Sequence, residues 1–245
     1  MRISIIIPAL NEEVCLAKTL AAVTQLRPSE IIVADGGSTD RTVEIAQKHV
    51  IAPKHVRVLH SVMGRGSQLR AAAESASGEV LWFLHADSIP SPAALEGIRE
   101  CLANERVAGG NFSLCFDGES RSARQLTLIY PRLRWLGLCY GDSGIFVRRA
   151  VYQLVGGFQP YPIFEDLDLV RRIRRIGEFR TLPQKLLTSS RRFEHRNFAV
   201  MFAEWTALQA LFWAGVSPNR LARWYKPVRK HADRNSHHDT IGLPG

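Results

Sequence analysis

The sequence has few cysteines, and none of them forms a pattern typical of a metal site or a redox pair. The four are Cys15, Cys101, Cys115 and Cys139. They lie far apart and include no C-x-x-C pair, which excludes a zinc knuckle and a redox dithiol. We therefore expect reduced thiols. With 245 residues, 46% of them hydrophobic, the chain is long enough to bury a core without disulfides.

Long apolar runs are also missing. No stretch without Asp, Glu, Lys or Arg exceeds fifteen residues, whereas a transmembrane helix needs about twenty predominantly apolar ones. The apolar run Ile3–Ile7 at the N-terminus is too short for a secretory signal. We therefore expect a cytoplasmic protein that does not span a membrane.

Acidic residues are fewer than basic ones. The chain has 32 Lys and Arg against 23 Asp and Glu, a formal net charge of +9. This excess favours an anionic partner: a nucleotide, a nucleic acid or an acidic lipid headgroup. Residues 217–245 alone contain six basic and two acidic residues. We expect 231–245 to be a disordered tail.

Strand-like and helix-like segments alternate in the first half of the chain. Short apolar runs typical of buried strands occupy 3–7, 31–34, 55–60 and 80–84, and helical patterns occupy 12–26, 39–49 and 66–76. This order predicts an α/β fold with a mostly parallel sheet flanked by helices.

The second half changes character but contains no linker. Ser91 and Pro92 predict a helix start, as N-cap and first helical residue. A strand is expected over 108–116, strand, turn and helix over 141–158, and a helix from 163 to 177. We expect one continuous domain to residue 195, whose second part is α+β, and a helical extension over 196–230.

Polar segments follow the first two predicted strands. PALNEE (8–13) and DGGSTD (35–40) both lie at strand carboxyl ends, where open α/β sheets bind their ligands. An alternative is purely structural: Asn11, Ser38 and Asp40 would be helix caps and the glycines would serve a turn.

An aspartate follows the fourth strand, in His85-Ala86-Asp87. A carboxylate at this edge suits Mg²⁺ or Mn²⁺, which prefer oxygen ligands and often hold a diphosphate. The alternative for Asp87 is a turn aspartate bound by backbone N–H groups. We expect His85 to be a packed or hydrogen-bonding residue and not a metal ligand.

Two helix starts carry charged residues. Gly64-Arg65-Gly66 precedes the third helix, where Arg65 could bind a phosphate, although a flexible surface turn is an equal alternative. Glu165 and Asp166 open a later helix, where acids complement the helix dipole and a structural role would suffice.

Taken together, the motifs resemble the family 2 glycosyltransferases of the GT-A fold. IIIPALNEE, IIVADGGSTDRT, WFLHADS, GDSGIFVRR and FEDLDLVRRIRRIG match the pattern of that family in order and spacing. The resemblance covers about residues 1–195 and is closest to a bacterial subgroup labelled as arsenosugar-biosynthesis glycosyltransferases. It implies a nucleotide-binding half over 1–105 and an acceptor half over 106–195.

The resemblance also implies roles for individual residues. Asp166 would be the catalytic base and Asp87 the metal ligand for Mg²⁺ or Mn²⁺. Gly141, Asp142 and Glu165 would lie near the transferred sugar or the acceptor. The nucleotide pocket would be lined by Pro8, Ala9, Asn11, Glu12, Asp35, Gly37, Arg65 and Ala86.

The chain departs from the family pattern at two motifs. His85 replaces the first acid of the D-x-D element, which leaves Asp87 as the expected metal-diphosphate ligand. Of the Q-x-x-R-W element of processive members only Arg192 is present. A single sugar transfer is therefore expected rather than polymerisation.

The expected activity is inverting transfer of a sugar from a nucleotide sugar, by default a UDP-sugar, to an unidentified acceptor that is lipid-linked or a small molecule. The apolar segment 198–216 could lie on an anionic membrane surface or dock on the domain core; a nucleic acid partner is not expected. Two alternatives remain. One is a catalytically weak nucleotide-sugar-binding or membrane-associated scaffold protein. The other is a sugar nucleotidyltransferase, against which the lack of glycine in PALNEE counts.

Overall fold

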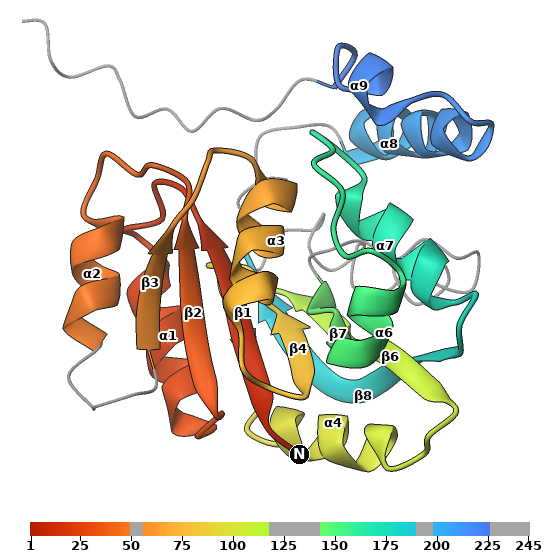
Figure 1. The fold of residues 1–245 in the computed structure, drawn as a ribbon. Helices are drawn as coiled ribbons and strands as arrows, with labels where there is room; N and C mark the ends of the chain where they lie inside the picture. The colour runs from red at the N-terminus through yellow and green to blue at the C-terminus, as the bar shows by residue number, and fades with distance from the viewer. Residues whose placement is uncertain (50–55, 118–142, 190–197, 226–245) are drawn as a thin grey trace, which may run out of the picture.

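The computed structural model describes residues 1–49, 56–117, 143–189 and 198–225 (Figure 1). Its first half alternates strands and helices, as the sequence predicts. The elements are β1 Ile3–Ala9, α1 Leu16–Gln25, β2 Glu30–Asp35, α2 Thr42–Lys48, β3 Val56–His60, α3 Arg65–Ser75 and β4 Val80–Phe83.

The second half adds strands that run in both directions. The elements are β5 Ser88–Pro90, α4 Ala94–Leu102, β6 Val107–Phe116, β7 Phe146–Arg148, α6 Arg149–Leu154, α7 Glu165–Ile173, β8 Glu178–Thr188, α8 Phe198–Trp213 and α9 Pro218–Leu221.

The described strands form one eight-stranded sheet in the order β3-β2-β1-β4-β7-β6-β8-β5. The strands β3, β2, β1 and β4 are parallel, whereas β7 pairs antiparallel with both β4 and β6. The predicted α/β fold class, a mostly parallel mixed sheet flanked by helices, is confirmed. Because β1 and β2 are in register from Ser4–Glu30 to Ala9–Asp35, their carboxyl ends lie side by side.

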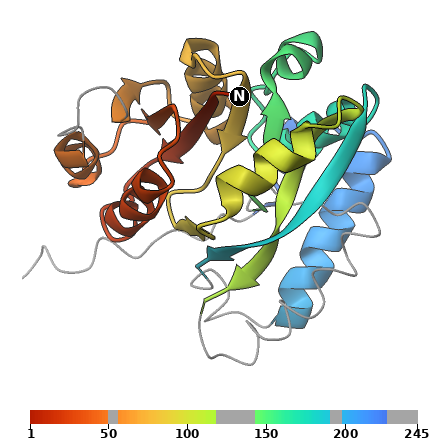
Figure 2. The same cartoon turned by 90° about the horizontal axis from the view of Figure 1, so that it is seen from below.

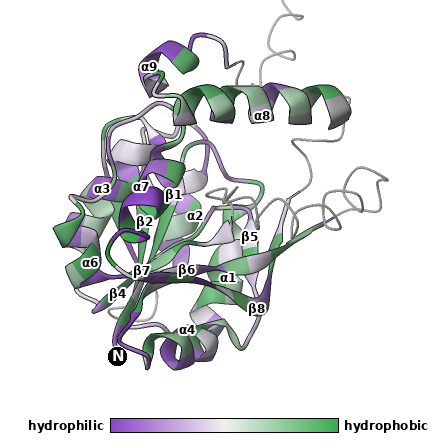
Figure 3. Cartoon of the chain, turned by 90° about the vertical axis from the view of Figure 1, so that its right-hand side faces the viewer, coloured by the Kyte–Doolittle hydropathy of each residue, from purple (hydrophilic) through white to green (hydrophobic). Residues whose placement is uncertain are grey.

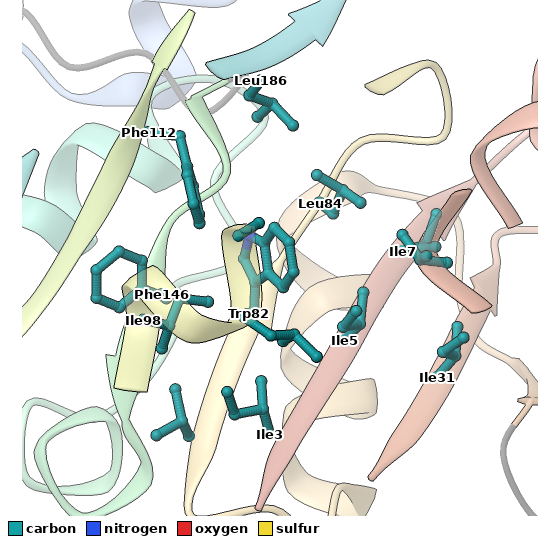
Figure 4. Close-up of a cluster of buried hydrophobic side chains, with 14 of the residues drawn as sticks. Ile3, Ile5, Ile7, Ile31, Trp82, Leu84, Ile98, Phe112, Phe146 and Leu186 are labelled. Carbon is teal, nitrogen blue, oxygen red and sulfur yellow. The ribbon is translucent and has the colours of Figure 1, made fainter. Parts of the chain in front are cut away.

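Apolar side chains cover both faces of this sheet. On one face, Trp82 packs against Phe112, with ring centroids 5.1 Å apart (Figure 4). This cluster also takes in buried residues of α1, α2 and α4, and Figure 2 shows α4 lying across β6 and β8. On the other face, α3, α6 and α7 pack around Phe83 and Phe158. Because β1 and β2 are buried on both faces, their sequences are nearly continuous apolar runs.

Several element boundaries differ from the predictions. The first helix begins at Leu16 and not at residue 12, because Asn11 takes a left-handed backbone conformation (φ 54°) and the turn closes through the carbonyl of Glu12. The helix α4 begins at Ala94; Ser91 accepts a weak bond from the N–H of Ala93 (3.4 Å), so Ser91 as N-cap with Pro92 as first helical residue was wrong.

Two strands were not predicted. The strand β5 has only three residues, too few for a periodic pattern. The strand β8 contains Pro183, which ordinarily argues against a strand. Its register with β6 shifts where Phe112 and Ser113 pair with Leu182 and Lys185, so Pro183 lies in a bulge that accommodates it.

The extension after residue 195 places α8 at the end of the molecule opposite the N-terminus (Figure 3). Leu208 and Phe212 of α8 cluster with Leu167 of α7, and the rings of Phe212 and Phe164 lie 5.2 Å apart. One side of α8 therefore docks on the start of α7. No helix in the described ranges is both long and apolar enough for a membrane crossing.

A buried carboxylate holds the other end of the sheet together. Oε1 of Glu30 accepts hydrogen bonds from the hydroxyl of Ser4 (2.5 Å) and from the N–H (2.5 Å) and hydroxyl (2.8 Å) of Ser77. Burial acts to raise the pKa of Glu30, but these hydrogen bonds and the nearby Arg57 guanidinium outweigh it, so the pKa lies below its ordinary value of 4.5.

We expect Glu30→Gln to lower the free energy of unfolding by about 1–2 kcal/mol near neutral pH, because the hydrogen bonds lose their charge assistance. A lowered folded-state pKa stabilises the fold above the unfolded-state pKa, and this contribution is lost as the pH falls through the folded-state value. The difference between wild type and variant should therefore shrink below about pH 4.5. Urea unfolding at neutral and acidic pH measures it.

The matched control is Glu74→Gln, which removes an exposed carboxylate that pairs with Arg70 on α3. Exposed pairs of this kind contribute about 0–1 kcal/mol. A Glu30→Gln protein as stable as the control protein at neutral pH would contradict the role given to Glu30.

Candidate functional site

The loops after β1 and β2 are joined by hydrogen bonds at the carboxyl edge of the sheet. The N–H of Asn11 donates to the hydroxyl of Ser38 (3.0 Å), and Oδ1 of Asn11 accepts from the N–H of Thr39 (2.9 Å). Asn11 therefore links the two loops, and the N-cap of α1 is Cys15. Asp40 does accept a bond from the N–H of Thr42, the first residue of α2, at 3.0 Å.

Asp35 ends β2 as a buried carboxylate. It accepts hydrogen bonds from the N–H groups of Gly37 (3.0 Å) and Ser38 (3.2 Å), and its Oδ2 lies 3.5 Å from Nδ1 of His60. Gly37 has a φ of +93°, which favours glycine. The turn is thereby fixed in shape, with Asp35, Pro8 and Ala9 on neighbouring strands.

Gln68 of α3 forms hydrogen bonds to the same edge of the sheet. Its side-chain amide donates to the backbone carbonyls of Ala9 and Ala34, both at 2.8 Å, and the residue is buried. It thus satisfies the ends of β1 and β2 with one group. This contact could not be predicted from the sequence, since Gln68 lies in an ordinary helical pattern.

The turn after β4 brings His85, Ala86 and Asp87 to this edge. The carbonyl of Ala86 accepts a hydrogen bond from the hydroxyl of Thr19 (2.8 Å), and the carbonyl of His85 accepts from the N–H of Ser88 (3.2 Å). These bonds hold the turn against α1 and β5. Asp87 lies within it and is partly buried.

Arg65 connects this turn to the acids of α7. Nη1 of Arg65 forms an ion pair with Glu165 and lies 3.6 Å from Oδ2 of Asp166, while Nη2 lies 2.6 Å from Nε2 of His85. A guanidinium can only donate, so Nε2 of His85 accepts and the ring proton lies on Nδ1. Four residues from three separate segments therefore meet at one point.

Close backbone packing explains the glycines around Arg65. A Cβ at Gly66 would lie 2.5 Å from the carbonyl oxygen of Gln159, and Gly64 has a φ of +130°. Gly66 therefore allows the segment before α7 to approach the backbone of α3. The same approach brings Glu165 within reach of Arg65.

The start of α7 fixes Asp166. Phe164 precedes the helix in a left-handed conformation (φ 63°), and the N–H of Leu167 donates to Oδ1 of Asp166 at 2.7 Å. Glu165 and Asp166 are both buried. The acids also suit the positive end of the helix dipole, so the local sequence favours this arrangement even before any ligand binds.

Three predicted site residues, Gly141, Asp142 and Arg192, lie outside the described residues. Glu12 lies in the loop after β1, where its N–H donates to the hydroxyl of Thr42 (2.7 Å). The structure brings the other predicted residues to the carboxyl edge of β1, β2 and β4 and to the start of α7.

A divalent cation fits this site only if a ligand completes it. No three His, Cys, Asp or Glu side chains gather as a metal site within the part of the chain that the structure describes. Nε2 of His85 already accepts from Arg65, which leaves the carboxylate of Asp87 as the oxygen donor of the turn. One carboxylate suffices for Mg²⁺ or Mn²⁺ when substrate phosphates supply other ligands.

Comparisons with known proteins show a family and several similar proteins. Residues 4–156 match the family described as glycosyl transferase family 2. The probable glycosyltransferase YdaM of Bacillus subtilis is 24% identical over 198 residues, 72% of this chain and 47% of that protein. The undecaprenyl-phosphate 4-deoxy-4-formamido-L-arabinose transferase of Pectobacterium carotovorum is 34% identical over 41% of this chain and 33% of its own length.

Two solved structures share the fold. The mannosyltransferase PcManGT from Pyrobaculum calidifontis, in complex with GDP-Man and Mn²⁺, has a TM-score of 0.62 at 20% identity, covering 76% of this chain and 56% of its own. The glucosyl-3-phosphoglycerate synthase of Mycobacterium tuberculosis, with Mn²⁺, UDP and glucosyl-3-phosphoglycerate, has a TM-score of 0.59 at 21% identity, covering 82% and 75%. The chain spans about half the length of YdaM and of PcManGT.

Proposed function

Because the chain belongs to glycosyl transferase family 2, we propose that it transfers one sugar from a UDP-sugar to an acceptor hydroxyl with inversion at the anomeric carbon. The observation that carries this proposal is the meeting of Arg65, Glu165 and Asp166 beside the turn that holds Asp87. A leaving diphosphate needs positive charge and an attacking hydroxyl needs a base, and Arg65 and Asp166 are the groups that we propose for these two roles. Membership of the arsenosugar-labelled subgroup remains a prediction.

The donor would lie across the joined loops of β1 and β2. We propose that the base and ribose would contact the hydrogen-bonded turn at Asp35 and Gly37 and the loop at Asn11 and Glu12. Arg65 and Ala86 lie where the diphosphate would follow. The similar structures hold GDP-Man or UDP; UDP is the nucleotide that we propose for this chain.

The transfer step needs one proton acceptor. The acceptor oxygen attacks C1 of the sugar from the face opposite the diphosphate, and the bond from C1 to the β-phosphate oxygen breaks. The electron pair of that bond leaves with the diphosphate, and the hydroxyl proton moves to the carboxylate of Asp166. Arg65 and the N–H of Leu167 keep this carboxylate oriented.

Asp87 would hold Mg²⁺ or Mn²⁺ together with the donor diphosphate. The cation would supply positive charge to the leaving group. The first position of the family's D-x-D element is His85, which binds Arg65 instead. Arg65 therefore adds a fixed positive charge at the place where the chain lacks a second acid.

The acceptor is proposed to be lipid-linked and to be used at the inner membrane surface. One similar protein is, by its name, an undecaprenyl-phosphate sugar transferase. An acceptor phosphate would carry no proton at neutral pH for a base to remove, so the buried Asp166 favours a hydroxyl of a lipid-linked molecule. Gly141 and Asp142 are proposed to line this side, and Arg192 to contact the diphosphate.

We expect Asp166→Asn to lower kcat for sugar transfer by roughly 10²–10⁴, with UDP affinity little changed, because the amide cannot accept the proton. Glu165→Gln should have a milder effect. The measurement is transfer of labelled sugar from a UDP-sugar to a lipid-linked saccharide, with UDP binding followed by calorimetry.

The matched control is Asp168→Asn in the same helical turn, where the carboxylate pairs with Arg172 at 2.6 Å. Asp168→Asn removes a negative charge from the first turn of α7 and the ion pair with Arg172, but it leaves Asp166 unchanged. It should therefore leave kcat within about threefold of wild type. If a folded Asp166→Asn protein also stayed within that range, Asp166 would not be the base.

We expect Asp87→Asn to abolish the effect of Mn²⁺ on UDP binding. In the wild type, Mn²⁺ should tighten UDP binding at least about tenfold, and the variant should bind UDP equally with and without it. Glu96→Gln, on the exposed side of α4, is the control and should behave as wild type. Equal transfer rates with and without a chelator would disprove the metal role.

A further inference from the structure

The helix α8 is apolar on nearly all of its sides, yet among its described side chains the buried ones lie on one side. Among its sixteen residues, Glu204 is the only charged one. The buried side consists of Leu208, Gln209 and Phe212, which face the start of α7. A helix that is apolar all round is ordinarily buried all round. The exposed apolar side of α8 is therefore unusual for a surface in contact with water.

The opposite side of α8 forms an exposed apolar strip. We call it the outer face and define it as Val200, Ala203, Ala207, Ala210 and Leu211. Their spacing of three, four, three and one places them on one side of a helix. Val200 is 55% exposed, and the exposed Glu204, four residues after Val200 and seven before Leu211, lies at the edge of the strip. Figure 3 shows α8 lying lengthwise across this end of the molecule.

Exposed tryptophan and arginine residues follow the outer face along the chain, and we call them its flank. Trp213 is 49% exposed at the end of α8, and Trp224 is 64% exposed just after α9. Arg220 and Arg223 are exposed between them. Exposed tryptophans beside basic residues are typical of the boundary between lipid headgroups and acyl chains.

We propose that the outer face of α8, with this flank, docks on an anionic lipid bilayer. A sixteen-residue helix is about 24 Å long, shorter than the hydrocarbon core, and would lie in the plane of the interface. A second copy of the chain fits less well. A twofold interface through this surface would place the arginines of two copies near one another, whereas anionic headgroups complement them.

This orientation would set the site against the membrane. The inner side of α8 contacts Phe164 and Leu167, which directly flank Glu165 and Asp166. A bilayer on the outer face would thus lie one helix diameter, about 10 Å, from the proposed base. The inference goes beyond the proposed function, because it concerns lipid binding and would hold without sugar transfer.

Vesicle flotation of the full chain tests the proposal. We expect binding to vesicles of phosphatidylcholine and phosphatidylglycerol in equal parts, and little binding to phosphatidylcholine alone. The double variant Val200→Glu/Leu211→Glu should lower the bound fraction at least about tenfold, because two charges enter the apolar layer. Arg220→Gln/Arg223→Gln should lower it by about tenfold or more and weaken its salt dependence.

The control is Leu154→Glu, which places the same charge on another exposed leucine, at the end of α6, and should float as the wild type does. UDP affinity should be unchanged in all variants, which separates this proposal from the proposed function. Equal binding to anionic and neutral vesicles would overturn the proposal. Binding of the Val200→Glu/Leu211→Glu variant at the wild-type level would also overturn it. The proposal would likewise fail if the wild type were a dimer and the Val200→Glu/Leu211→Glu variant a monomer.

Discussion

The ion pair between Arg65 and Glu165 is the contact on which the site depends. It joins the first residue of α3 to the first residue of α7, a hundred residues later. Together with the approach of Arg65 to Asp166 (3.6 Å) and the contact of Arg65 with His85, it links the start of α7 to the turn at His85 and Asp87. The Glu165 side chain is 5% exposed and that of Arg65 is 32% exposed, so water screens their attraction less than it screens that of a surface pair. One guanidinium thus brings the base to the sheet edge that would hold the leaving group.

The sheet supplies the other half of this arrangement. Strands buried on both faces place their carboxyl ends in one row, and Gln68 fastens two of these ends with a single amide. Gly66 then allows the segment before α7 to approach α3 closely enough for the ion pair. The site is therefore a product of backbone packing as much as of charged residues. Its polar groups are held in place before a donor arrives.

The sequence predicted the parts of this site better than their contacts. Apolar runs and loop composition were enough to place Asp35, Asp87 and Asp166 at element ends, since these signals are local. The meeting of Arg65 with His85 and Glu165 could not be predicted, because it depends on tertiary packing between distant segments. The strand β8 was missed for a related reason: Pro183 is tolerated in a bulge that only its partner strand defines. Resemblance to a family supplied the roles that the residues alone left open.

A double-mutant cycle between Arg65 and Glu165 tests the central claim most directly. The unfolding free energies of wild type, Arg65→Gln, Glu165→Gln and the double variant should give a coupling of about 1–3 kcal/mol, as expected for a partly buried charged pair in contact. The exposed pair Arg70 and Glu74, on the same helix α3, is the reference and should give about 0–0.5 kcal/mol. A coupling between Arg65 and Glu165 no larger than the reference would contradict the account.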